Sequence, residues 1–191
     1  MNICIYGASS NELDKKYLLS AEELGKKIAV RGHGLVFGGG IQGLMGAVFR
    51  GVSGQGNFTL GVAPKFFDKP GILCRDCSEF IFTDNMRQRK EIMETHSDAF
   101  IMVPGGIGTL EEFFEILTLK QLNRLNKPVA VFNAFGYYDD LQKMLQHAVK
   151  EKFMKPACRN IYGVFSDADA LLDYIEKEAS APIDLRHLKN I

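Results

Sequence analysis

Hydrophobic and polar residues form blocks along the chain that predict strands followed by helices. Short apolar runs are typical of buried parallel strands, and longer stretches with apolar residues three or four positions apart are typical of helices. Strands are predicted at 2–6, 35–37, 58–63, 79–83, 99–103, 128–133 and 161–166. Helices are predicted at 20–31, 40–52, 85–96, from 110 onward, at 139–152 and at 167–179. This alternation indicates an α/β fold: a Rossmann-like, doubly wound parallel sheet between two helical layers.

The length of the chain suits a single domain. A chain of 191 residues buries enough apolar surface to fold without disulfides or structural metals. We therefore interpret residues 1–179 as one Rossmann-like domain. Residues 180–191 show no hydrophobic period and are predicted to form a C-terminal tail.

Charge and composition argue against several kinds of partner. The 23 Lys and Arg residues balance the 23 Asp and Glu residues. The chain therefore has no excess of positive charge that would favour binding to nucleic acid or to an anionic membrane. No apolar run approaches eighteen residues, and the N-terminus lacks a basic segment followed by an apolar one. We expect a cytoplasmic protein that binds neither nucleic acid nor membrane.

The four cysteines are expected to be reduced thiols. Cys74 and Cys77 have the spacing of half a zinc site or of a redox pair. A second C-x-x-C or an H-x₃-H is missing from the sequence, and the motif does not open a helix after a strand. We interpret both as loop cysteines and expect no metal site.

A glycine-rich turn, Pro104-Gly105-Gly106-Ile107-Gly108-Thr109, joins the predicted strand at 99–103 to the helical pattern that starts at Leu110. A helix N-terminus offers unpaired N–H groups and a positive dipole, so this turn is typical of a phosphate cradle. Thr109 and Glu112 also fit a capping box, in which the glutamate would bond back to the cap. In either case Glu111 and Glu112 are expected in the first helical turn, where they would repel a nearby phosphate.

Two further predicted strands end in small residues, at Gly7-Ala8-Ser9-Ser10 and at Gly38-Gly39-Gly40. In an open parallel sheet these turns share one edge with the glycine-rich turn, which places Ser9 and Gly39 at a ligand site. Residues 38–43 match the G-x-G-x-x-G fingerprint, but the next strand lacks the terminal acid that binds a dinucleotide ribose, and no P-loop motif occurs. A mononucleotide or sugar phosphate is the better ligand, unless these glycines serve only tight turns.

The predicted helix at 85–96 carries an arginine on its apolar face. Met86, Arg89 and Met93 recur at helical spacing, so Arg89 should point inward, whereas Arg87 lies on the outer face. An unpaired buried charge costs several kcal/mol. Arg89 therefore requires an anionic partner, which can be Glu112, a ligand phosphate or both.

Two motifs carry a family resemblance. Residues 104–112 fit PGGxGTxxE and residues 86–90 fit MxxRK. On these motifs the chain, from about residue 2 to 175, resembles the "lysine decarboxylase-like" family best known for the LONELY GUY cytokinin-activating enzymes. The resemblance implies hydrolysis of the N-glycosidic bond of adenosine 5'-monophosphates, plain or N6-prenylated, to free base and ribose 5-phosphate, without a cofactor. A decarboxylase is not favoured, because no lysine has the features of a Schiff-base lysine.

The resemblance also implies roles for individual residues. Arg89 and Glu112 correspond to the catalytic pair, and Gly105, Gly106, Gly108 and Thr109 to the phosphate cradle, with Met86, Lys90 and Glu111 also in the substrate site. A carboxylate can stabilise an oxocarbenium-like state, attack it covalently or activate water. All three roles stay open for Glu112. Ala8, Gly71 and Leu119 depart from many relatives, and the change at Gly71 leaves the base preference open.

Two other functions and one oligomeric state follow from the same residues. A carrier or sensor could keep the cradle without turnover, and a hydrolase could act on another phosphorylated ribose compound.

The helix from Leu110 carries a second apolar line at Ile116, Leu119 and Leu122, and a helix that is apolar on two sides must be buried twice. We therefore expect a homodimer, as the family resemblance also implies.

Overall fold

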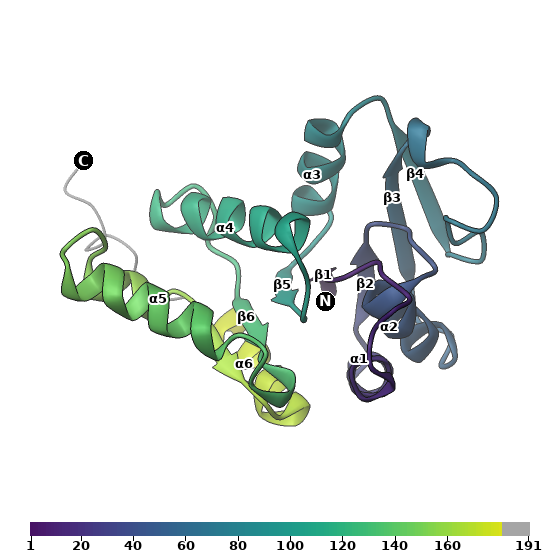
Figure 1. Cartoon of the computed structure of the whole chain (residues 1–191). Coiled ribbons are helices and arrows are strands. Elements are labelled where there is room, and N and C mark those ends of the chain that lie inside the picture. The colour runs from purple at the N-terminus through teal and green to yellow at the C-terminus, as the bar shows by residue number, and fades with distance from the viewer. Residues whose placement is uncertain (181–191) are drawn as a thin grey trace.

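The computed structural model describes residues 1–180, which fold around one seven-stranded sheet (Figure 1). All neighbouring strands are parallel, in the order β4-β3-β2-β1-β5-β6-β7. The strands are β1 (Asn2–Tyr6), β2 (Gly34–Phe37), β3 (Thr59–Pro64), β4 (Glu79–Thr83), β5 (Ala99–Met102), β6 (Val129–Phe132) and β7 (Gly163–Phe165). The helices are α1 (Lys15–Val30), α2 (Gly43–Ser53), α3 (Met86–Thr95), α4 (Ile107–Gln121), α5 (Asp139–Lys150) and α6 (Ala168–Ser180). Single 3₁₀ turns lie at η1 (Lys65–Phe67), η2 (Ala134–Gly136) and η3 (Pro156–Asn160).

The helices cover both faces of the sheet. One core packs α1, α2 and α6 against the sheet, and a second core packs α3, α4 and α5 against the opposite face. In β1, Ile3 and Ile5 belong to the first core and Cys4 and Tyr6 to the second, which explains why a central strand has no polar alternation. The predicted three-layer α/β fold is confirmed.

Two helices begin earlier than the hydrophobic pattern predicted. Helix α1 starts at Lys15 rather than at residue 20, because the Asp14 side chain caps it by accepting the Lys16 N–H at 3.0 Å. Helix α4 starts at Ile107 rather than at Leu110, with Gly106 as its N-cap. In both cases the first turn is largely exposed, so it carries no apolar period.

The end of the last predicted helix, residue 179, lies within one residue of the observed end of α6. Helix α6 runs to Ser180, and the tail predicted beyond it lies at 181–191, outside the described residues. Within residues 1–180, no helix combines the length and the apolar character that a membrane crossing requires.

A buried ion pair joins the end of α4 to α6. The Lys120 side chain is fully buried; its ammonium pairs with the Glu178 carboxylate and donates to the Lys127 carbonyl at 2.8 Å. Burial lowers the pKa of Lys120, and Glu178 opposes this change. Because an unpaired buried charge costs several kcal/mol, the pair ties α4 to the last helix of the described chain.

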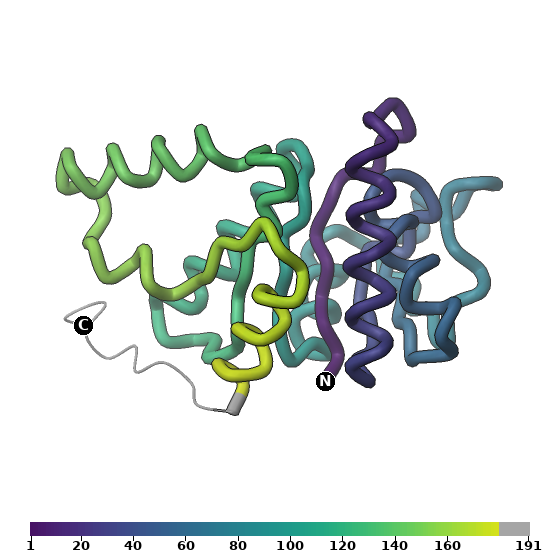
Figure 2. Tube along the Cα trace, turned by 90° about the horizontal axis from the view of Figure 1, so that it is seen from below, coloured from purple at the N-terminus to yellow at the C-terminus, as the bar shows by residue number. Residues whose placement is uncertain are grey.

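The order of the strands creates a crevice. Strand β1 lies at the centre of the sheet, as the purple N-terminal segment does in Figure 2, and the connections run outward from it in both directions. The switch point is between β1 and β5, where ligands bind beyond the carboxyl ends of the strands. The loops after these two strands meet there, because the Ala8 N–H donates to the Pro104 carbonyl at 3.1 Å.

Candidate active site

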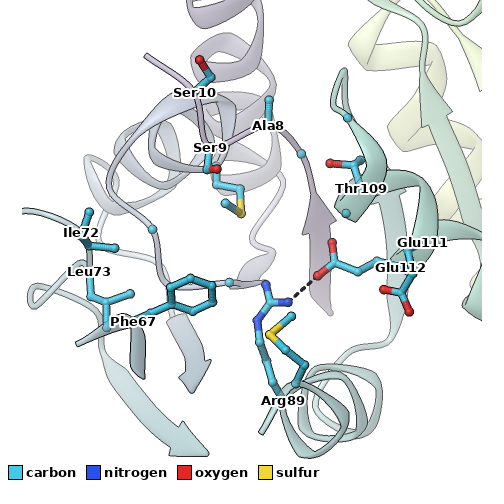
Figure 3. A pocket seen from close by; sticks show the side chains of 17 residues that line it. Ala8, Ser9, Ser10, Phe67, Ile72, Leu73, Arg89, Thr109, Glu111 and Glu112 are labelled. Atoms are coloured by element: carbon cyan, nitrogen blue, oxygen red, sulfur yellow. Dashed lines mark hydrogen bonds and ion pairs between the residues drawn. The ribbon is translucent and has the colours of Figure 1, made fainter. Parts of the chain in front are cut away.

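A cavity of about 460 Å³ opens at this crevice (Figure 3). Its walls come from the loops after β1, β2 and β3, from α2 and α3, and from the N-terminus of α4. The sequence-predicted residues that line it are Ser9, Met86, Arg89, Gly106, Gly108, Thr109, Glu111 and Glu112. Segments up to a hundred residues apart in the sequence therefore form one site.

The N-terminus of α4 is built to receive an anion. Gly106 is its N-cap in an extended conformation, and no side chain caps the helix. The first bond to a preceding carbonyl is from the Leu110 N–H to Gly106 at 3.0 Å. Within the described chain, the N–H groups of Ile107, Gly108 and Thr109 thus have no hydrogen-bond partner. These donors and the helix dipole together favour a phosphate.

The capping box is not formed. Thr109 lies inside α4 rather than at its cap, and the Glu112 carboxylate bonds to Arg89 instead of returning to Thr109. Because α4 starts at Ile107, neither Glu111 nor Glu112 is in its first turn. This corrects the predicted placement of both glutamates in the first turn.

Glu112 and Arg89 form a buried pair at the cavity wall. Arg89 Nη1 donates to Glu112 Oε1 at 2.5 Å, and the two side chains are 8% and 9% exposed. Figure 3 shows the two side chains pointing toward one another from α3 and α4. Glu112 is thus the anionic partner that the inward-facing Arg89 requires. No described residue bonds to Glu112 Oε2, so this oxygen is available to a ligand.

Burial controls the protonation of Glu112. Removal from water raises the pKa of the Glu112 carboxyl, and the neighbouring Arg89 guanidinium offsets part of this rise. A carboxylate with a raised pKa and a fixed cationic partner in a cavity is typical of a catalytic group.

Three sequence-predicted site residues do not line the cavity. Lys90 pairs with Glu111 and, at 2.7 Å, with Glu115. Gly39 is buried under the Phe80 ring with φ +73°. Gly105 is buried beneath Thr109; a Cβ there would lie 2.2 Å from Thr109 Oγ1.

The sequence did not reveal two other parts of the site. Phe67, Ile72 and Leu73 in the β3–β4 loop form an apolar wall across from Glu112 (Figure 3). A long loop at the carboxyl edge of the sheet was the signal available for them. The Tyr137 hydroxyl donates to the Gly105 carbonyl at 2.9 Å and so braces the glycine-rich turn. No sequence signal links these two residues.

The chemistry of the cavity follows from its three parts: backbone donors for an anion, a buried carboxylate and an apolar wall for a flat ring. Among residues 1–180, no cluster of His, Cys, Asp or Glu side chains could hold a metal ion. Fold and site together define a Rossmann-like protein whose cavity combines an uncapped helix N-terminus with a buried carboxylate.

The chain belongs to the family described as "Possible lysine decarboxylase", whose model matches residues 45–175. It is 39% identical over 187 residues to a rice protein (Oryza sativa subsp. japonica) named probable cytokinin riboside 5'-monophosphate phosphoribohydrolase LOGL5, covering 98% of this chain and 76% of that protein. It is 38% identical over 177 residues to cytokinin riboside 5'-monophosphate phosphoribohydrolase LOG3 of Arabidopsis thaliana, covering 93% and 82%. The predicted family resemblance is confirmed.

Solved structures show the same fold. The molybdenum cofactor carrier protein of Chlamydomonas reinhardtii superposes with a TM-score of 0.70 at 24% identity, covering 94% of this chain and 98% of that one. The molybdenum cofactor binding protein of Rippkaea orientalis superposes with a TM-score of 0.66 at 22% identity, covering 92% and 94%. At these identities the likeness concerns the fold alone.

Proposed function

We propose that this chain is a phosphoribohydrolase that cleaves the N-glycosidic bond of adenosine-type nucleoside 5'-monophosphates, cytokinin nucleotides included. The observation that carries the proposal is the position of the buried Glu112 carboxylate beside the uncapped N-terminus of α4, in one cavity. The names of the curated relatives support the same reaction.

The cavity orients such a substrate in one direction. The 5'-phosphate lies at the N-terminus of α4, where the Gly108 and Thr109 N–H groups are unpaired within the described chain. The base lies against the apolar wall of Phe67 and Ile72, which can contact a flat ring or an apolar substituent. The ribose then lies between them, with its anomeric carbon near Glu112 Oε2.

The reaction breaks the bond from C1' to the base nitrogen and forms a bond from C1' to a water oxygen. The base leaves with a proton, and water supplies the hydroxyl of ribose 5-phosphate. Positive charge develops on the ribose as the bond to the base breaks. Glu112 stabilises this charge electrostatically, attacks C1' as a nucleophile or activates the attacking water as a base. Arg89 holds one oxygen of that carboxylate at 2.5 Å and leaves the other to the substrate.

The family's older description does not suit this cavity. A decarboxylase with a Schiff-base cofactor needs a lysine at the reacting centre. No lysine lines the cavity in the described chain. Lys90, which pairs with Glu111 and Glu115, and Lys120, which pairs with Glu178, both lie outside the cavity lining.

The proposal is tested with a panel of 5'-mononucleotides and the matching nucleosides, by chromatography for free base. AMP and N6-prenylated AMP are expected to release base, and adenosine is expected to be a poor substrate because it lacks the anion that α4 binds. Equal cleavage of adenosine would contradict the phosphate site. Tight binding of AMP without release of base would instead support the carrier function.

The oligomeric state is a further part of the proposal: the chain acts as a homodimer. Of the apolar line predicted to face a partner, Ile116 is buried in the chain's own core, Leu119 packs against that core and Leu122 is half-buried, so that line alone does not require a partner. Ile107 beside the cavity and Phe153 after α5 are 88% and 90% exposed, which supports burial by a second copy. A monomer in sedimentation at micromolar concentration would contradict this.

A further inference from the structure

The guanidinium of Arg89 is held by its surroundings on several sides. Nε donates to the Val62 carbonyl at 3.2 Å, and Nη1 donates to Glu112 at 2.5 Å. No residue of the described chain accepts a hydrogen bond from Nη2, and Arg89 lines the cavity. Nη2 is therefore the nitrogen left to meet a substrate oxygen.

Gly38, the first residue after β2, lies directly against this nitrogen. A Cβ on Gly38 would be 2.2 Å from Arg89 Nη2 and 3.3 Å from both Arg89 Cζ and Met45 Sδ. A Cβ atom essentially never lies within 3.0 Å of a heavy atom of a residue that is not its neighbour in the chain. Any residue other than glycine would thus force the guanidinium to move, and it cannot move without straining its bonds to Val62 or Glu112.

The backbone does not account for glycine at this position. Gly39 and Gly43 have φ of +73° and +60°, where other residues are strained, whereas Gly38 is not among the residues with positive φ. The first glycine of the Gly38-Gly39-Gly40 turn is therefore required by the space that Arg89 fills.

We propose that Gly38 is a positioning residue that seats the Arg89 guanidinium, so that Nη1 holds Glu112 while Nη2 faces the substrate. The turn after β2 thus serves the reacting centre, whereas the phosphate is bound by the turn before α4. This inference rests on the proposed hydrolase function only for its effect on rate; the steric contact between Gly38 and Arg89 is independent of it.

The test is a double-mutant cycle between Gly38→Ala and Arg89→Ala, read by kcat for AMP cleavage and by the thermal unfolding midpoint. With Arg89 present, Gly38→Ala is expected to lower kcat about 100-fold, the usual scale for a displacement of about 1 Å at a reacting centre. It is also expected to lower the unfolding midpoint. In the Arg89→Ala background only the contact with Met45 Sδ at 3.3 Å remains, so the shift in the midpoint is expected to be much smaller.

The matched control is Gly40→Ala. Its Cβ would meet only Met45 Cε at 3.5 Å and the Ile72 carbonyl at 4.0 Å, so its effect on the midpoint should be the same in both backgrounds. Wild-type kcat in Gly38→Ala, or an equal loss of stability or of folding in both backgrounds, would overturn the inference. If the unaltered protein releases no base from AMP, the proposed function fails, and the thermal cycle still decides the role of Gly38.

Discussion

Replacing Glu112 with Gln separates the charge of this side chain from its shape. Gln fills the same volume and still accepts the Arg89 Nη1 hydrogen bond, but it leaves a side chain that is 8% exposed without its counter-charge. Breaking a buried pair costs about 3 to 5 kcal/mol. Burial already disfavours the ionised carboxylate, since it raises the pKa of Glu112. We therefore expect a loss of no more than about 3 kcal/mol, which lowers the unfolding midpoint by roughly 6 to 12 °C.

Turnover should fall much further than stability. Loss of a catalytic carboxylate costs on the order of 100- to 10,000-fold in rate, whereas AMP binding should survive because the α4 donors are unchanged. The assay is release of free base at saturating AMP, with binding measured by calorimetry. Glu115→Gln, on the same helix but paired with Lys90 outside the cavity, is the control and should keep wild-type turnover. Hydrolysis at the wild-type rate by a folded Glu112→Gln protein would refute the mechanism.

Three further predictions concern the neighbours of this carboxylate. Arg89→Ala should lower kcat at least about 100-fold, because it removes the group that orients Glu112. Arg87→Ala, at an exposed position on the same helix, should leave kcat within about twofold of wild type. Equal effects of the two substitutions on kcat in steady-state kinetics would contradict this prediction. Tyr137→Phe removes the hydroxyl that donates to the Gly105 carbonyl. It should raise KM for AMP roughly fivefold at nearly constant kcat, since one hydrogen bond contributes about 1 kcal/mol. An unchanged KM would show that this hydrogen bond does not support substrate binding. Burial raises the pKa of Glu112 above its ordinary value of 4.5, and the reaction needs the ionised carboxylate. We therefore expect kcat/KM to decline as the pH falls through this raised pKa. A value of kcat/KM that stays constant down to pH 4.5 would contradict an essential Glu112 carboxylate.

The sequence predicted those parts of the molecule that repeat a local pattern. Buried parallel strands are apolar on both faces, so runs such as Ile3–Tyr6 gave the sheet and its layers. The inward position of Arg89 also followed from helical spacing, and the cost of a buried charge pointed to Glu112. Local patterns thus indicated both the fold and the charged centre of the site.

The parts that could not be predicted depend on contacts between distant segments or on exposed turns. The start of α4 was missed because Ile107 and Gly108 are exposed, and an exposed helical turn has no apolar period. The brace from Tyr137 spans 32 residues, and the contact between Gly38 and Arg89 exists only after β2 and α3 are packed. Glycines look alike in a sequence, so the neighbour that requires each of them appears only in the structure.

The ion pair between Lys120 and Glu178 has a consequence during synthesis of the chain. All the cavity-lining residues lie before position 113, so a ribosome has made the whole site well before it reaches Glu178, 58 residues after Lys120. Until Glu178 is made, Lys120 of α4 has no carboxylate to pair with at its buried position. A nascent chain halted before α6 would therefore hold every residue that lines the cavity, while α4, which carries Thr109 and Glu112, would still lack its contact with α6.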